Sequence, residues 1–252
     1  MYKFPILDFD QLNNEMNSLK IPAYKKLPYI YENMGGTFYD KEKRLLKGCT
    51  VAITGIGGLP IGIKGNEYQI LNNDVSLEDI KNNLGKTLGM SAGMSYLNPY
   101  NKTLNDLADK TLSLGHNSIK HSIFLNILLV GLSIGVEHEF STQRDIIHLS
   151  RLTVAKTSAQ KHPCLVVNNE KQVELYKNIL DFTDKQIESY NDEEKDWEAL
   201  NLLYPTAKAS MIMISGSLRN IEKLVSLKNS DGKEDEFVDI LNKIENIISW
   251  LK

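Results

Sequence analysis

The residues best suited to chemistry gather in one stretch of the chain, from Gly115 to Gln160. This stretch holds most of the histidines and the densest cluster of Arg, Thr, Ser and Gln side chains. Its centre is an uncharged run, Ser122–Val136, which polar residues flank on both sides. A buried segment with hydrogen-bonding groups at its two ends can bind a polar ligand while its apolar part excludes water. We therefore interpret this stretch as the core of an active site.

Two groups of polar residues flank the uncharged run. His116 and His121 precede it, and five residues follow it: Glu137, His138, Glu139, Gln143 and Arg144. The histidines are candidates for contacts with a cofactor, or for ordinary hydrogen bonds at the start of a helix. No metal site is expected among the residues that follow the run, because the pattern lacks a third convergent ligand.

Three arginines suit the binding of an anion: Arg144, Arg151 and Arg219. A guanidinium group offers a fixed fork of donors, which fits a phosphate or the carbonyl group of a base. Such a group also stabilises negative charge that develops during a reaction. The alternative for each arginine is a structural salt bridge, and the sequence leaves both interpretations open.

Composition excludes several classes of protein. The 252 residues include 29 Lys and Arg against 32 Asp and Glu, which gives a formal net charge of -3. A broad nucleic-acid surface would need a basic surplus, so no nucleic-acid partner is expected. The two cysteines, Cys49 and Cys164, provide neither a disulfide framework nor a CxxC zinc pair.

Membrane association and secretion are not expected either. The uncharged run is shorter than the roughly 20 apolar residues that cross a bilayer, and Asn126 interrupts it. The first residues lack a basic start followed by a long apolar segment, so no secretory signal is visible. We expect a cytoplasmic protein, and we expect the run Ser122–Val136 to form a core helix.

The chain divides into an N-terminal extension, residues 1–48, and a single domain, residues 49–252. The extension contains a predicted helix from Asp10 to Lys20. After Cys49, a β-branched strand runs into the glycines of GIGG. Leu59-Pro60 follow these glycines and no helix opens, which favours a glycine-kinked strand or hairpin over a phosphate-binding loop.

The remainder of the chain predicts mainly helices. Ser76 and Thr103 each begin a capping-box pattern, and Gly115 ends the second of these helices. The segment GMSAGMSYLNPYN between them is predicted as a loop. Further elements are a buried strand after Pro163, helices over Glu170–Tyr190 and Trp197–Leu203 with a turn between them, a strand or buried helix over Ala209–Ile214, and helices from Ser217 to Leu227 and from Glu236 to Leu251.

Three blocks of sequence carry a resemblance to a known family. The first is GHNSIKH at residues 115–121, similar to the motif GHxSxxEH but one residue shorter and with Lys120 at the Glu position. The second, Ser133–Arg144, aligns with SRAxxxQLxRHR and places Glu139 at the Gln. The third runs from Pro205 and Ser210 through Ser217-Leu218-Arg219 and Leu227-Lys228 to Glu236-Phe237. In this order and spacing the sequence resembles the flavin-dependent thymidylate synthases, as a divergent member.

Two departures from the family pattern concern the binding of ligands. Thr142-Gln143-Arg144 stands where the family has Arg-His-Arg, so only the last arginine is retained. The family's phosphate-binding tail, SxNxxSxRY, is not legible after Arg144. Its nearest equivalents are Arg151, Thr153, Lys156, Ser158 and Gln160, and they require a short insertion.

The resemblance implies an α+β fold in which helices pack around a small, mainly antiparallel sheet. It implies FAD-dependent methylation at C5 of a pyrimidine nucleotide, dUMP to dTMP, with methylenetetrahydrofolate and NAD(P)H as co-substrates. It also implies a homotetramer with active sites between subunits. The residues that it assigns are Arg144 and Arg219 to catalysis; His116, Ser118, His121, Gln143, Arg144 and Lys223 to the cofactor; and Glu139, Arg151, Ser158, Gln160, Arg219 and Lys228 to the substrate.

Three alternatives remain open from the sequence. The same fold could act on UMP, CMP or a modified pyrimidine nucleotide, since the phosphate-binding tail has changed. The loss of Arg-His-Arg would also fit a non-catalytic, nucleotide-binding homologue. Finally, His162-Pro163-Cys164 superficially resembles the nucleophile of the unrelated thymidylate synthases, but Cys164 leads a Val-rich strand and is better explained as a packed core thiol.

Overall fold

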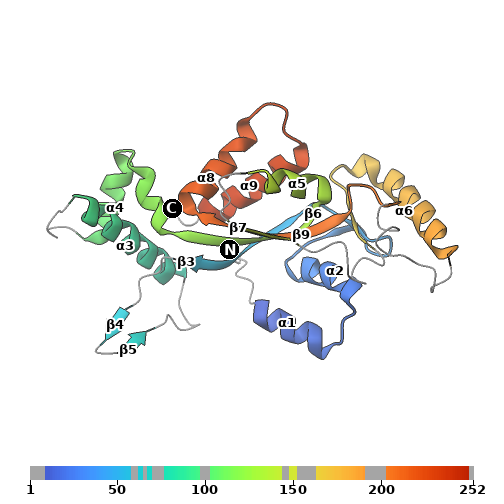
Figure 1. Ribbon diagram of the computed structural model, residues 1–252, viewed down its shortest axis with the longest axis horizontal. Helices are drawn as coiled ribbons and strands as arrows, with labels where there is room; N and C mark the ends of the chain where they lie inside the picture. Colours follow the sequence, from blue (N-terminus) through green and yellow to red (C-terminus); the bar gives the residue numbers. More distant parts are fainter. Residues whose placement is uncertain are drawn as a thin grey trace.

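The structure is a computed structural model that describes residues 9–57, 62–64, 67–69, 77–96, 103–143, 148–151, 163–190 and 203–249. Helices and strands are mixed along the described chain, with five consecutive strands, β1 to β5, between the first two helices and α3 (Figure 1). In order they are α1 (Phe9–Ser18), α2 (Ala23–Asn33), β1 (Phe38–Asp40), β2 (Leu45–Leu46), β3 (Thr50–Gly57), β4 (Gly62–Lys64), β5 (Glu67–Gln69), α3 (Leu77–Tyr96), α4 (Leu104–Ser113), the 3-10 helix η1 (Asn117–Ser122), β6 (Phe124–Ser133), α5 (Ile134–Ser141), β7 (His148–Arg151), β8 (Leu165–Val166), η3 (Glu170–Gln172), α6 (Val173–Glu188), β9 (Ala209–Ser217), α8 (Leu218–Ser226), η6 (Leu227–Asn229) and α9 (Asp235–Ser249).

A four-stranded antiparallel sheet organises the molecule. Its strand order is β3-β6-β9-β7, so the two longest strands, β6 and β9, lie at its centre. A smaller sheet, β1-β2-β8, contains one parallel pair, between β2 and β8. Helices α8 and α9 cover one face of the main sheet, and α1 and α2 lie on its other side (Figure 1). The predicted α+β fold, with helices around a mainly antiparallel sheet, is confirmed.

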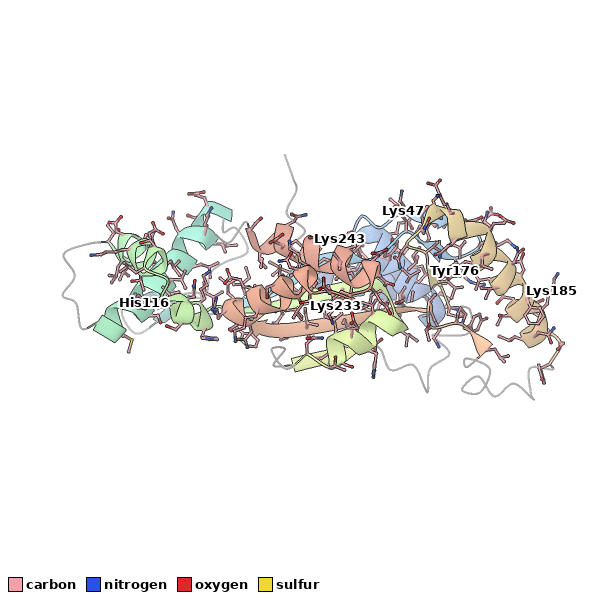
Figure 2. All side chains as sticks on the ribbon, turned by 90° about the horizontal axis from the view of Figure 1, so that it is seen from above. Lys47, His116, Tyr176, Lys185, Lys233 and Lys243 are labelled. Atoms are coloured by element: carbon pink, nitrogen blue, oxygen red, sulfur yellow. The ribbon has the colours of Figure 1, made fainter. Side chains whose placement is uncertain are left out.

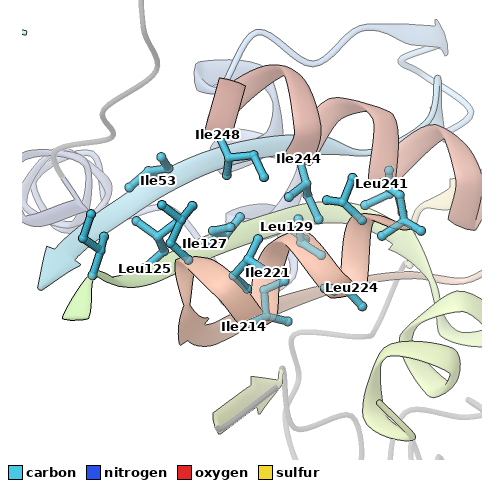
Figure 3. Close-up of a cluster of buried hydrophobic side chains, with 14 of the residues drawn as sticks. Ile53, Leu125, Ile127, Leu129, Ile214, Ile221, Leu224, Leu241, Ile244 and Ile248 are labelled. Atoms are coloured by element: carbon cyan, nitrogen blue, oxygen red, sulfur yellow. The ribbon is translucent and has the colours of Figure 1, made fainter. Parts of the chain in front are cut away.

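The uncharged run forms a strand, and the prediction of a core helix there is wrong. Residues 124–133 are β6, and a helix begins only at Ile134. Leu125, Ile127 and Leu129 point to the core beneath α8 and α9 (Figure 3), whereas Leu128 and Val130 pack towards α2. A central strand that is buried on both faces has no polar alternation, so its sequence looks the same as that of a buried helix.

Two other expectations for this half of the chain have clear outcomes. Ala209–Ser217 is a strand, which settles the choice that periodicity left open. Helix α3 continues to Tyr96, so the predicted loop is wrong over its first half. Gly89 allows the close crossing of α3 and α4, because a Cβ atom there would lie 1.9 Å from the backbone oxygen of Leu104. The glycines that suggested a loop therefore serve helix packing.

The segment before residue 49 packs directly on the sheet through Tyr31 of α2. Its side chain is fully buried, and its hydroxyl lies 2.9 Å from the carbonyl oxygens of Thr37 and Gly48. The ring faces Gly131, a β6 residue with φ +81° at an irregularity in the β6–β9 pairing. A Cβ atom at this position would lie 2.8 Å from the ring. Glycine is therefore required both by the backbone conformation and by the contact.

The remaining predicted elements agree with the structure where it describes them. The helix over residues 10–20, the strands after Cys49 and Pro163, and the helices near 103–115, 170–190, 217–227 and 236–251 are all present with small shifts at their ends. The predicted turn at 191–196 lies outside the described residues, as does nearly all of the predicted helix over 197–203. No helix in the described part of the chain is long and apolar enough to cross a membrane.

Candidate functional site

The first and third sequence blocks meet at the start of α8. His121, the last residue of the first block, has its Nδ1 atom 2.8 Å from the Oγ of Ser217. The same oxygen accepts a hydrogen bond from the backbone N–H of Asn220 at 3.2 Å, so Ser217 is also the N-cap of α8. Ser217 is buried and His121 is exposed, which leaves the outer part of the imidazole ring available to a ligand.

An ion pair strengthens this junction. The Nζ of Lys120 lies 2.7 Å from a carboxylate oxygen of Glu222 on α8, and both side chains are only about one-seventh exposed. Lys120 occupies the position at which the family motif has a glutamate. The pair fixes η1 against α8 and thereby holds the neighbouring His121 in place.

Four predicted ligand-binding residues surround the same junction. Arg219 is half-buried in the first turn of α8, and Lys223 lies one turn further along the helix. His116 and Ser118 are exposed on and beside η1. These side chains provide hydrogen-bond donors and positive charge at one end of the sheet. They are suited to an anionic ligand such as a phosphate.

The second block joins the third block at the opposite end of β6. The buried carboxylate of Glu236 on α9 accepts hydrogen bonds from the backbone N–H of Ser133 at 2.7 Å and from the Nδ2 of Asn168 at 2.9 Å. Ser133 in turn caps α5 through its hydroxyl, which accepts from the N–H of Val136. Glu236 therefore fixes the start of the helix that carries Glu139. Sequence reasoning noted Glu236 only as a match to the family and missed this role.

The predicted residues of the second block make protein contacts in the structure. A carboxylate oxygen of Glu139 lies 3.1 Å from the Nζ of Lys233, and the side-chain amide of Gln143 donates to the backbone oxygen of Glu139. Lys228, from the third block, pairs with Glu245 on α9. These three residues are thus engaged in contacts that stabilise the fold, and a ligand would have to compete with them.

Four predicted site residues remain: Arg144, Arg151, Ser158 and Gln160. Arg144, Ser158 and Gln160 lie outside the described residues. For Arg151 the backbone is described as the last residue of β7, where it pairs with Ile212. The assignments of all four to substrate or cofactor stay predictions.

The two polar groups that flank the uncharged run lie apart within one chain. A strand of ten residues at about 3.3 Å per residue spans about 30 Å, and β6 separates the His121 junction from α5. Figure 2 shows His116 towards one end of the elongated molecule and Lys233, the partner of Glu139, near its middle. The interpretation in which both ends of one buried segment reach a single ligand therefore does not hold within the described part of one chain.

Buried charges near α5 are a further feature that sequence reasoning missed. Lys208 is 5% exposed, and burial lowers the pKa of its ammonium group, while the nearby Glu137 carboxylate acts in the opposite direction. Glu137 is itself only 5% exposed. A lysine that precedes a short apolar run carries no sequence signal of burial, so only the packing of α5 against β9 reveals this arrangement.

Cys164 has the environment of a core thiol. Its side chain is buried beside α2 and β6, and desolvation raises the pKa of the thiol to about 12. A nucleophilic cysteine needs a lowered pKa, so the geometry supports the prediction of a packed thiol. The residue lines one wall of a pocket of about 570 Å³ between α1, α2 and β1, together with Ile21, Tyr29 and Phe38. None of the predicted site residues lines this pocket.

Comparisons with known proteins identify the fold. No family model matches the sequence, and no curated protein matches it. Among solved structures, the flavin-dependent thymidylate synthase ThyX from Helicobacter pylori, complexed with FAD and dUMP, superposes with a TM-score of 0.55 at 15% identity. That alignment covers 65% of this chain and 88% of ThyX.

A second solved structure has the same fold. It is the UMP/dUMP methylase PolB from Streptomyces cacaoi bound with 5-Br UMP, with a TM-score of 0.56 at 10% identity, over 82% of this chain and 92% of PolB. The chain therefore shares the fold of the flavin-dependent thymidylate synthase ThyX and of the methylase PolB, at low sequence identity.

Proposed function

We propose that this protein methylates C5 of a pyrimidine nucleotide in a flavin-dependent reaction. The observation that carries the proposal is the junction at the start of α8, where His121 contacts Ser217, the N-cap of the helix whose first turn contains Arg219. This junction joins two sequence blocks of the family on a fold shared with an FAD- and dUMP-bound synthase and with a UMP/dUMP methylase. The fold alone would not be sufficient to assign this activity, because one fold can support many activities, and the motifs alone are too divergent to do so.

The residues at the junction fit a flavin nucleotide. Arg219 and Lys223 offer positive charge on one side of α8, and His116 and Ser118 offer donors from η1. Such groups match the pyrophosphate of FAD or the phosphate of a nucleotide. FAD, if bound and first reduced by NAD(P)H, would supply the hydride that reduces the transferred one-carbon group, and would be released from the step as oxidised FAD.

The chain's own residues have two tasks in this proposal. Arg219 binds a phosphate or a base carbonyl through its guanidinium fork, and it stabilises negative charge that develops on the pyrimidine. His121, held by Ser217, donates a hydrogen bond from the ring nitrogen that does not face the serine. No enzyme nucleophile is needed, which agrees with the buried, poorly acidic thiol of Cys164.

A homotetramer would complete the site. Helix α5 lies about one strand length from the His121 junction within one chain, so Glu139 would reach the ligand from a neighbouring subunit. The substrate is dUMP or UMP, and methylenetetrahydrofolate and NAD(P)H act as co-substrates. UMP is included as a substrate because PolB, which has the same fold, is a UMP/dUMP methylase.

The visible spectrum of the purified protein is the first test. A flavin absorbance band, together with thermal stabilisation by FAD and by dUMP or UMP, is the expected result. Conversion of dUMP or UMP to the C5-methylated nucleotide in the presence of FAD, methylenetetrahydrofolate and NADPH would establish the reaction. A colourless protein that neither FAD nor any of the nucleotides stabilises would overturn the proposal, and binding without turnover would identify a non-catalytic homologue.

Two variants test whether nucleotide binding depends on the His121 junction or on the general positive charge of the surface. Arg219→Gln should weaken nucleotide binding at least about tenfold, because it removes a charge-assisted contact. Lys185→Gln removes one positive charge on α6, at the far end of the molecule (Figure 2), and should leave binding unchanged. Equal effects of the two changes would show that only general electrostatic attraction had been measured.

A further inference from the structure

One polar residue interrupts the otherwise apolar strand β6 on the face that turns away from α8 and α9. Leu125, Ile127 and Leu129 point towards those helices (Figure 3), so the residues between them, including Asn126, belong to the opposite face. On that face, α1 and α2 pack over Leu128 and the residues beyond it. Asn126 itself is half-buried.

The carboxamide of Asn126 has a fixed orientation. Ser215, its partner in the β6–β9 register, donates a hydrogen bond from Oγ to the Oδ1 of Asn126 at 2.7 Å. Ser215 is 5% exposed, so this contact lies beneath the surface. Because Oδ1 is held on the serine, Nδ2 turns towards β3, and none of the described residues accepts a hydrogen bond from it. The strand thus presents an oriented N–H donor.

The neighbouring strand is shaped to make room for this amide. Gly55 lies opposite Asn126, and a Cβ atom at Gly55 would be 2.9 Å from Nδ2. The register of β3 shifts here, so that Thr54 is the extra residue of a β-bulge. Its hydroxyl lies 3.4 Å from the backbone oxygen of Asn126. Bulges of this kind often re-aim side chains beside functional sites, and a glycine opposite an amide allows a ligand to approach closely.

Apolar side chains flank the donor on the same face. Phe124 lies two residues earlier on β6, and Met213 lies two residues earlier on β9, within 3.7 Å of the Thr54 hydroxyl. Both are half-buried. A phenyl ring and a thioether beside a single oriented donor suit a flat ring that carries a carbonyl group.

The donor is also continuous with the proposed active site. Phe124 pairs with Ser217 in the β6–β9 register, and Ser217 contacts His121. Ser215 and Ser217 alternate with inward-facing residues on β9 and therefore share a face. Asn126 therefore lies two residues along the strand from the position opposite Ser217, on the same face of the sheet.

We propose that Asn126 is a ligand-binding residue, which donates a hydrogen bond from Nδ2 to a ring carbonyl of a planar heterocycle lying on this face of the sheet. The carbonyl belongs to the uracil base or to the isoalloxazine ring, which carry the same imide edge. Ser215 is the positioning residue that fixes the amide, and Gly55 provides the space. The identification of the ring rests on the proposed function; the presence of an oriented donor does not.

Binding measurements with three serine or asparagine variants test the inference. Asn126→Asp keeps the shape and the acceptor for Ser215 but replaces the outward donor with an acceptor, so affinity for the bound ring should fall at least about tenfold. Ser215→Ala leaves the amide unfixed and should cause a smaller loss, about threefold to tenfold. Ser210→Ala removes a buried hydroxyl from the same strand, at its other end, and serves as the matched control with unchanged affinity.

The choice of ligand distinguishes the two rings. Isothermal titration with dUMP, UMP and FAD separately should show the loss for only one class, the uracil nucleotides or the flavin. Melting temperatures without ligand report whether each variant is folded. If the wild type binds these ligands and Asn126→Asp binds all of them equally well, the inference is wrong while the proposed function stands.

A second measurement does not depend on enzymatic activity or on phosphate binding. Protein labelled with ¹⁵N-asparagine gives a side-chain amide signal for Asn126, identified by its absence in Asn126→Asp. The protein is titrated separately with uridine and with riboflavin, neither of which contains a phosphate group. One of these two compounds should shift the Asn126 signal. If neither compound shifts it, Asn126 is not a binding residue, whatever the protein's activity.

Discussion

The Nδ1 atom of His121 and the Oγ atom of Ser217 lie 2.8 Å apart, although 96 positions separate the two residues in the chain. The contact joins the end of the first sequence block to the start of the third. Because Ser217 also caps α8, one hydroxyl group determines both the orientation of the imidazole and the first turn of the helix that carries Arg219. The geometry of the proposed site therefore depends on this pair.

Substitution of Ser217 should affect both stability and binding. Ser217→Ala removes the cap of α8 and the contact with His121, and should lower the free energy of unfolding by about 1 kcal/mol. Ser217→Thr retains the hydroxyl and should lose less of both properties. Urea unfolding measures the first effect, and titration with the nucleotide that binds best measures the second. Full nucleotide affinity in folded Ser217→Ala would contradict a role for the pair in binding.

The ion pair between Lys120 and Glu222 should be coupled energetically. Both side chains are largely shielded from solvent, so removal of either partner leaves the other poorly compensated, and each single change should cost about 1–3 kcal/mol. The exchange Lys120→Glu with Glu222→Lys retains the attraction and should recover part of that loss. A double-mutant cycle based on urea unfolding gives the coupling energy. Strict additivity of the two single changes would show that the contact contributes nothing.

Glu236 should be a structural residue of the second block. Glu236→Ala leaves the buried N–H of Ser133 and the amide of Asn168 without their acceptor, which should destabilise the protein by about 2–4 kcal/mol. Glu236→Gln keeps one acceptor oxygen and should cost less. As a control, Glu234→Gln changes an exposed acid just before α9 and should have little effect. Equal stability of the alanine variant and the wild type would show that the hydrogen bonds are replaceable by water.

Lys208 should give the stability a distinct dependence on pH. Burial lowers the pKa of its ammonium group below 10.5, so between the lowered value and 10.5 the unfolded chain binds a proton that the folded chain lacks. Stability therefore rises with pH in this window, by at most about 1.4 kcal/mol per pH unit. Below the window both states are protonated and the effect is constant.

The difference between wild type and Lys208→Met isolates this contribution from other groups that titrate at alkaline pH. The free energy of unfolding of the wild type, relative to that of the variant, should increase as the pH is raised from 7 towards 10. Urea unfolding at a series of pH values measures it. A difference that stays flat over the whole range would mean that the lysine remains fully protonated in the folded protein.

Much of the fold could be predicted from local patterns. The cap at Thr103, the helix over Val173–Glu188 and the final amphipathic helix depend on interactions within a few residues, and all are present in the structure. The strand β6 was predicted as a helix because burial on both faces removed its alternation. The glycines of α3 indicated a loop because the sequence does not show why glycine is needed there. Gly89 is needed because the backbone of Leu104, in α4, lies against it.

The site was predictable only in part. The sequence singled out His121 and Arg219, and in the structure His121 contacts the N-cap residue of the helix that carries Arg219. It did not indicate Ser217 as the partner of His121, or Asn126 and Ser215 as a fixed pair, because each contact crosses between strands or helices distant in sequence. The assignments of individual residues to cofactor and substrate stay predictions.

The sequence by itself determined the class of fold, the order of the three blocks and the slightly negative net charge, because composition, capping and motif order are properties of the chain alone. Only the tertiary structure decided which blocks meet. A strand carries its residues about twice as far per position as a helix. Because β6 is a strand and not a helix, Glu139 lies far from His121, and the neighbour of that histidine is Ser217, at the end of β9 and the start of the helix that carries Arg219.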